Sequence, residues 1–135
     1  MNGSRGLRNN NPGNIRRNGD HFKGEVIPSQ DRDFKQFETM AYGYRAMFKI
    51  LTTYYNRYEL KTIRQLITRW APPSENETEI YIRRVSDWSG IPAEKVLDIT
   101  VPEHLTAIVA AMSRMENGAT AVVEEVKAGW ELLHE

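Results

Sequence analysis

The chain has 135 residues, 40% of them hydrophobic, which is enough for one domain with a single core and too little for two. Its 18 basic and 18 acidic residues cancel, which excludes the strong positive field that gathers nucleic acid or an anionic membrane. There is no cysteine, the three histidines are scattered, and no apolar run reaches the length of a membrane span, so we expect no disulfide, metal site or membrane insertion.

The first predicted element is a loop at residues 5–16, RGLRNNNPGNIR, which holds four asparagines, two glycines and a proline. These residue types favour tight turns, and asparagine amides both donate and accept hydrogen bonds. The loop therefore suits a neutral polar ligand such as a sugar, and the candidate binding side chains are Asn10, Asn11, Asn14 and Arg16. The alternative is that NNNPG forms only a surface turn.

Residues 18–38 are rich in glycine, aspartate, serine and proline with short apolar pieces, which predicts a small irregular β-hairpin region. Helical spacing of apolar residues then predicts a helix over about 40–58 whose stripe packs in the core. A capping box at Thr62 and Gln65 starts a short helix that ends before Pro72.

The next helix is predicted to run to Gly90 from one of two capping boxes, Ser74 with Glu77 or Asn76 with Glu79. Pro92 predicts the start of another short helix.

Two helices are predicted in the last third of the chain. A capping box at Thr100 and Glu103 precedes the most apolar one, which ends at Asn117-Gly118. Apolar residues from 119 to 133 then predict a final amphipathic helix. The fold class is therefore mainly α, with a small α+β character near the N-terminus.

Glu116 is the candidate catalytic acid. Glycosidic bonds break when a carboxylic acid in a partly apolar setting protonates the leaving oxygen. Glu116 follows an apolar helix that includes Met112 and Met115, and both that setting and a helix C-terminus disfavour a charged carboxylate. We expect Glu116 to fold back and share a sugar-sized cleft with the N-terminal amides. The alternative is a solvated glutamate beside an Asn-Gly helix stop.

Residues 71–85, APPSENETEIYIRRV, form a second constellation in which Tyr81 and Thr78 lie on one helical face. Tyr81 is expected to present its hydroxyl to the cleft, where it would orient the reacting centre; otherwise it is a core aromatic with its hydroxyl at the rim. Glu75, Asn76 and Thr78 are candidate substrate-binding residues, although Asn76 also suits helix capping.

Two stretches resemble a family of enzymes. ETEIYIRRV, residues 77–85, resembles the E-T-x-x-Y-V-x-x-V helix of SLT-type lytic transglycosylases, whose tyrosine lies beside the catalytic glutamate. IVAAMSRMENG, residues 108–118, is similar to the glutamate-ending helix of that family. The order of the two stretches is reversed here.

The N-terminal half is similar to the bacterial glucosaminidases. NNNPGNIR, the following FKGE, and the later F-x-x-F and GYRA elements resemble the segment that follows their catalytic helix. The two likenesses together imply a circularly permuted lysozyme-like domain. Termini that lie close together at a domain surface make such a rearrangement physically acceptable.

The whole chain also resembles small phage and prophage proteins that begin RG-[IL]-RNNNPGNIR and carry W-A-P-x-x-E-N-x-T-x-x-Y, here residues 70–81. The resemblance implies a single lysozyme-like domain over 1–135, with phage virion or delivery-system proteins as partners and no cofactor. The N-terminus lacks a secretory signal, so synthesis in the cytoplasm and delivery to the periplasm or cell wall are expected.

The leading hypothesis is a monomeric muramidase or lytic transglycosylase that cuts the β-1,4 bond between N-acetylmuramic acid and N-acetylglucosamine. Glu116 would serve as acid and then base, Tyr81 would support it, and Trp70 would face a sugar ring. Glu38, Glu75 and Asp33 are candidates for a second carboxylate; without one, the substrate supplies its own nucleophile and an anhydro-sugar forms.

Two alternatives belong to other classes of protein. One is a non-catalytic virion or wall-binding module that keeps the groove without a competent acid. The other reads the four N-terminal arginines and the asparagines as a nucleic-acid contact. The zero net charge and the lack of a recognition helix disfavour the latter, so no nucleic-acid partner is expected.

Overall fold

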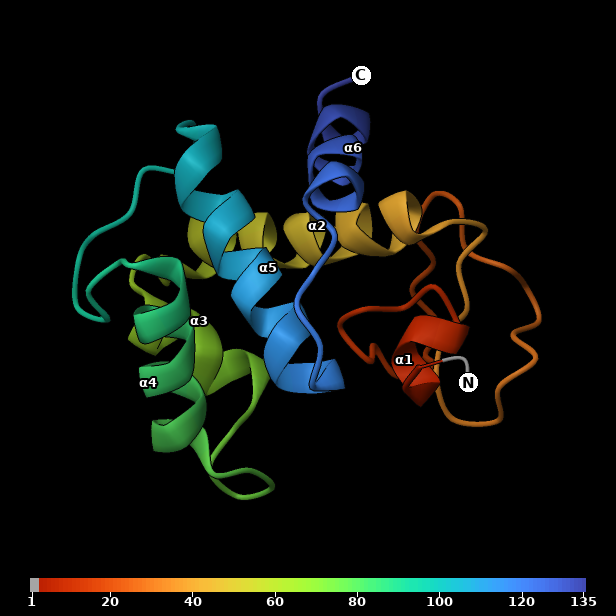
Figure 1. Ribbon diagram of the computed structural model, residues 1–135, viewed down its shortest axis with the longest axis horizontal. Helices are drawn as coiled ribbons and strands as arrows, with labels where there is room; N and C mark the ends of the chain where they lie inside the picture. Colours follow the sequence, from red (N-terminus) through yellow and green to blue (C-terminus); the bar gives the residue numbers. More distant parts are fainter. Residues whose placement is uncertain (1–2) are drawn as a thin grey trace.

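The computed structural model describes residues 3–135 and is built mainly from α-helices, which confirms the mainly α part of the predicted fold class. Along the chain α2 lies across the molecule and contacts α6 and α5, while α3 and α4 pack together on one side (Figure 1). The short α1 and the long loop that follows it lie on the other side. The helices are α1 (Arg5–Arg8), α2 (Met40–Tyr58), α3 (Ile63–Trp70), α4 (Thr78–Ser89), α5 (Pro102–Asn117) and α6 (Val123–Leu133).

Two helix starts and one helix end agree with the sequence patterns. The hydroxyl of Thr62 caps α3 by accepting from the Gln65 N–H at 3.1 Å, as predicted. Thr39 caps α2 in the same way by accepting from the Tyr42 N–H at 3.2 Å. α5 ends at Asn117, and Gly118 follows with φ of 71°, a left-handed conformation that glycine adopts without strain.

The other predicted capping boxes are wrong, because α4 and α5 begin without a side-chain cap. These boxes were Ser74 with Glu77, Asn76 with Glu79, and Thr100 with Glu103. α4 begins at Thr78 without a side-chain cap, and the Asn76 amide donates instead to the carbonyl of Pro72. The hydroxyl of Thr100 donates to Asp98, so α5 starts at Pro102 without a cap from it. Asparagine, serine and threonine often make such local bonds in place of a helix cap.

Two further expectations about helices are corrected. Residues 92–95 form a turn closed by a hydrogen bond from Lys95 N–H to the Pro92 carbonyl, so the short helix expected there does not form. The last helix starts at Val123 instead of near residue 119, because residues 118–122 form the link that follows the α5 stop. An additional four-residue helix, α1, lies within the asparagine-rich segment.

The core is formed by the apolar faces of α2, α3, α4 and α5. On α5, Leu105, Ile108, Val109 and Met112 are almost completely buried, as their spacing predicts. Burying one such side chain contributes about 1.5–3 kcal/mol before entropy is counted. α5 is thus anchored along its length, and its C-terminal end is carried to the middle of the molecule (Figure 1).

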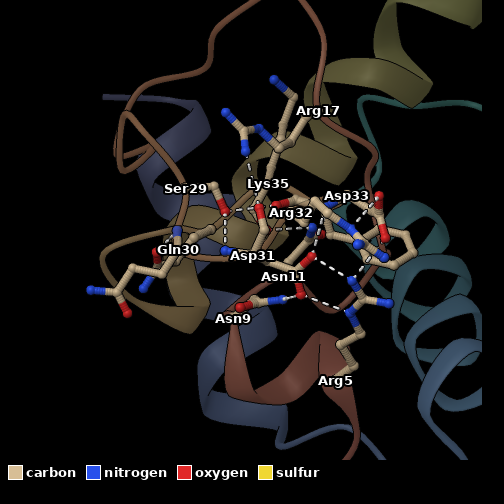
Figure 2. A network of polar contacts seen from close by, with 12 residues as sticks. Arg5, Asn9, Asn11, Arg17, Ser29, Gln30, Asp31, Arg32, Asp33 and Lys35 are labelled. Carbon is tan, nitrogen blue, oxygen red and sulfur yellow. Dashed lines mark hydrogen bonds and ion pairs between the residues drawn. The ribbon is translucent and has the colours of Figure 1, made fainter.

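The region 18–38 contains no strand, so the expected β-hairpin reduces to two isolated antiparallel bridges, Arg16 with Phe34 and Glu25 with Phe37. Side-chain hydrogen bonds replace a ladder there. Figure 2 shows Asp31 at the centre of the network: its carboxylate accepts from Arg5 at 2.7 Å and from the Asn9 amide at 2.9 Å. The Arg5 guanidinium and then Asn9 hold the pKa of Asp31 well below its usual range.

A buried ion pair also stabilises the region 18–38. The Lys35 side chain is 0% exposed, and its ammonium lies 3.1 Å from the Glu25 carboxylate, which is 5% exposed. Lys35 also donates to the Asp20 carbonyl at 2.6 Å. Although burial opposes the charge on Glu25, hydrogen bonds from the Phe22 N–H, Lys35 and His21 lower the pKa of Glu25 below its ordinary 4.5.

We expect Lys35→Met to destabilise the protein by about 3–5 kcal/mol, because it leaves the buried Glu25 carboxylate without its ammonium partner. Urea unfolding at pH 7 measures the change. The exposed lysine variant Lys23→Met serves as the control and should change stability by less than about 0.5 kcal/mol. Equal stabilities of the two variants would contradict the buried pair.

The same pair predicts a pH dependence. The folded-state pKa of Glu25 lies below its unfolded value, so its contribution to stability is present above about pH 4.5 and is lost as the pH falls through the lowered value. Urea unfolding from pH 7 down to pH 2 should show this loss in the wild type and a shallower slope in Glu25→Gln.

Within residues 3–135, none of the helices combines the length and the hydropathy that crossing a bilayer requires.

Candidate active site

A cleft of about 520 Å³ opens between the N-terminal loop, α2, the α3–α4 connection and the end of α5. This volume is in the range of pockets that bind small ligands. Its walls mix polar side chains with aromatic and apolar ones. The lining residues are Gly13, Asn14, Ile15, Arg16, Asn18, Phe34, Ile50, Tyr54, Trp70, Ala71, Pro72, Glu75, Asn76 and Glu116.

Glu116 projects into this cleft from the last turn of α5 and is half-buried. Its Oε1 accepts from the Asn14 amide at 3.1 Å. Its Oε2 accepts from the Tyr81 hydroxyl at 2.9 Å and from the Trp70 indole N–H at 3.3 Å. The three donors come from different parts of the chain, so the carboxylate is held in one orientation. The predicted meeting of this acid with an N-terminal amide is therefore confirmed.

Asn14 reaches Glu116 because the N-terminal loop is fastened to the end of α5. Asn117 donates to the Pro12 carbonyl at 2.8 Å and accepts from the Ser4 hydroxyl at 2.5 Å. Asn14 itself has φ of 48°, a left-handed conformation that asparagine tolerates better than most residues. We call the contacts of Ser4, Pro12, Asn14 and Asn117 across this junction the N-terminal latch.

Tyr81 of α4 is 5% exposed and absent from the cleft lining, so it does not present its hydroxyl to the cleft as expected but lies behind the Glu116 carboxylate. Burial, and after it the charge of Glu116, raise the pKa of Tyr81 well above its usual range. The phenol therefore stays protonated at neutral pH and acts as a hydrogen-bond donor to Oε2.

The other predicted residues that line the cleft are Trp70, Arg16, Glu75 and Asn76. Arg16 is exposed, and its guanidinium lies 4.9 Å from the centroid of Phe34. Of the three candidates for a second carboxylate, only Glu75 belongs to the lining. Asp33 pairs with Arg5 at 3.1 Å instead.

Asn10, Asn11 and Thr78 are absent from the lining and support its walls from behind. Asn11 is 0% exposed, and its amide donates to the carbonyls of Ile15 and Lys35 at 2.9 Å. The Asn10 amide donates to the Phe37 carbonyl, and the Thr78 hydroxyl to the Ala71 carbonyl. Their hydrogen-bonding capacity is used on the backbone, which is the usual role of such residues in turns.

Sequence reasoning missed part of the cleft wall. Ile50 and Tyr54 line it, whereas the sequence predicted only that the apolar stripe of the helix over 40–58 packs in the core. The two residues form an i, i+4 pair beside the buried stripe, and this pairing was the available signal. Phe34 was recognised only as an apolar piece of the irregular region.

Histidine, aspartate and glutamate residues do not gather in groups of three or more anywhere in residues 3–135, so the described part of the chain presents no metal-ligand cluster. The chemistry of the cleft is that of a single positioned carboxyl group with hydrogen-bond donors and aromatic faces around it.

No protein-family model matches the chain. It is similar to Protein P5 of Pseudoalteromonas phage PM2, with 43% identity over 133 residues. The matched part covers 95% of this chain and 81% of that protein.

Proposed function

The chain belongs to the family of Protein P5 of Pseudoalteromonas phage PM2, and we propose that it cleaves peptidoglycan at the β-1,4 bond between N-acetylmuramic acid and N-acetylglucosamine. The observation that carries the proposal is Glu116, a carboxyl group oriented by three donors inside a cleft of sugar size. The relative is a phage protein, and a phage has to pass the cell wall of its host.

In the proposed reaction the protonated Glu116 gives its proton to the oxygen that links the two sugars, and the bond from that oxygen to C1 of the muramic residue breaks. A hydroxyl group then attacks C1, and the Glu116 carboxylate takes up its proton. Tyr81 and Asn14 hold the carboxylate in line for both steps, while Trp70 and Tyr54 offer aromatic faces to the sugar rings.

The identity of the hydroxyl group that attacks C1 determines which of two products forms. Water gives a reducing sugar, whereas the C6 hydroxyl of the same muramic residue gives an anhydro-sugar. Glu75 is the second acidic residue of the cleft lining and the one candidate there for activating a water molecule. The two products differ by the mass of one water, so a mass spectrum of the released fragments separates them.

A lysozyme-like, circularly permuted arrangement is part of the proposal. Its support is the order of the parts: the glutamate-bearing helix comes late in the chain, yet its end is bonded to a loop 102 residues earlier. In space the end of α5 and α1 are neighbours (Figure 1). We further propose that the protein acts on the wall after delivery, together with other phage virion proteins.

The direct test is incubation of purified sacculi with the protein, followed by chromatography and mass spectrometry of the soluble fraction. The expected result is release of disaccharide-peptide fragments ending in muramic acid, reducing or anhydro. Retention of the protein on sacculi without any release would assign a wall-binding module in place of an enzyme.

Tyr81→Phe is expected to lower the rate of cleavage about ten- to hundredfold, because it removes a hydrogen bond to a charged group worth about 1.5–3 kcal/mol. The ring remains, so the fold should persist. Tyr55→Phe is the matched control, since that hydroxyl donates to the Leu97 carbonyl and not to Glu116. Initial rates on soluble glycan strands measure both, and equal rates would contradict the role of Tyr81.

A further inference from the structure

An arginine stacked on two tyrosines stands at the rim of the cleft. The Arg69 guanidinium lies 4.1 Å from the ring centroid of Tyr58 and 5.1 Å from that of Tyr54, which lines the cleft. Contact with two aromatic rings restricts the motion of the guanidinium, and its N–H groups can donate to a ligand. Arg69, Tyr54 and Tyr58 are called the rim cluster below.

The Arg69 guanidinium, which carries the charge of the rim cluster, has no acidic partner in the described residues. Among residues 3–135, the ion pairs include none that involves Arg69. Arg64, five residues earlier on the same helix, shows the contrast because it pairs with both Glu79 and Glu94. Arg69 is also exposed, so its guanidinium is accessible to a ligand from solvent, beside Tyr54 of the cleft lining.

The proposed substrate carries a matching charge. Muramic acid bears a lactyl group on C3, whose carboxyl is either free or joined to a stem peptide with carboxylates of its own. A guanidinium edge binds a carboxylate through two parallel hydrogen bonds. A glycan strand lying in the cleft therefore brings a carboxylate past the rim on every second sugar.

Resting on the proposed glycan cleavage, we propose that the rim cluster is a subsite for a carboxylate carried by the muramic residue, on its lactyl group or its stem peptide. The subsite makes the enzyme selective for muramic-acid-containing strands over neutral glycans of the same backbone.

The test compares three soluble substrates: peptide-bearing strands, strands whose peptides have been removed to leave the lactyl carboxylate free, and chitin oligosaccharides without carboxylates. Arg69→Gln should lower kcat/KM about tenfold or more on the substrates that use the subsite. Its activity on chitin oligosaccharides should stay within about twofold. Loss on the peptide-free strands alone identifies the free lactyl carboxylate, and loss on peptide-bearing strands alone identifies a carboxylate of the stem peptide. Loss on both muramic substrates means that the subsite accepts either carboxylate.

Two more variants sharpen the test. Arg69→Lys keeps the charge but not the planar edge, so it should recover only part of the loss. Arg84→Gln removes an exposed arginine of α4, a helix without the Tyr54 and Tyr58 rings that hold Arg69, and it should behave as wild type on all three substrates. Equal losses for Arg69→Gln on every substrate, or none, would overturn the subsite.

A binding measurement separates failure of the subsite from failure of the proposed function. Titration calorimetry with Glu116→Gln, and with the same variant carrying Arg69→Gln, measures affinity for the three substrates without turnover. In one outcome the wild type cuts nothing, Glu116→Gln binds muramic substrates more tightly than chitin oligosaccharides, and Glu116→Gln with Arg69→Gln shows no such preference. That outcome supports the subsite and contradicts the enzymatic function. Binding without that preference overturns the subsite.

Discussion

Glu116→Gln is expected to abolish the release of glycan fragments, with a fall in rate of at least about a thousandfold. The amide cannot donate the proton that the leaving oxygen needs, and cannot take one back in the second step. Its carbonyl oxygen still accepts one of the hydrogen bonds that hold the side chain, so the fold and the affinity for glycan should persist. Fragment release from sacculi and circular dichroism measure the two properties.

Glu103→Gln provides the matched control. It makes the same substitution in the first turn of the same helix, at an exposed position outside the cleft lining. It should release fragments at the wild-type rate. If Glu116→Gln retained a tenth or more of the activity while remaining folded, Glu116 could not be the catalytic acid.

Gly43→Ala is expected to destabilise the fold by about 3 kcal/mol or more, which corresponds to a fall in melting temperature of roughly 10 °C. Gly43 lies in α2 where the helix touches the N-terminal loop. An added Cβ would overlap the Asn10 carbonyl oxygen and lie 2.6 Å from Pro12 Cδ. The loop cannot retreat, because the Asn10 amide is bonded to the Phe37 carbonyl.

The sign of this result is informative because helix propensity opposes it. Alanine in place of glycine inside a helix gains about 1 kcal/mol, so net destabilisation means that the steric overlap prevails. Gly19→Ala is the control, since nothing lies within 4 Å of the added Cβ there. Thermal unfolding measures both variants, and a Gly43→Ala protein as stable as wild type would show that the loop does not pack on α2 as described.

The helices could be predicted from the sequence where the spacing of apolar residues determines them. α2, α3 and the end of α5 follow the apolar spacing, and the Thr62 cap forms as expected. The failures occur where a short polar side chain had a choice of partners: Thr100 bonds to Asp98, and Asn76 to the Pro72 carbonyl. Such choices depend on local backbone geometry, which periodicity does not contain.

The candidate acid could be selected from sequence because it ends an apolar helix, and its donors Tyr81 and Trp70 were already under consideration. The sequence could not show which asparagine would bond to Glu116. Four asparagines lie between residues 9 and 14, and only the fold separates Asn11, which is buried against the backbone, from Asn14, which bonds to Glu116. The catalytic role of Glu116 stays a prediction until fragments are measured.

The N-terminal latch also bears on when activity can arise during biosynthesis. Its two sides, around Asn14 and Asn117, are separated by about a hundred residues, so the ribosome has to complete nearly the whole domain before they can join. Contacts between distant positions also form slowly. A chain interrupted before residue 117 therefore cannot close the latch, and the proposed catalytic acid gains its Asn14 hydrogen bond only after that point in synthesis.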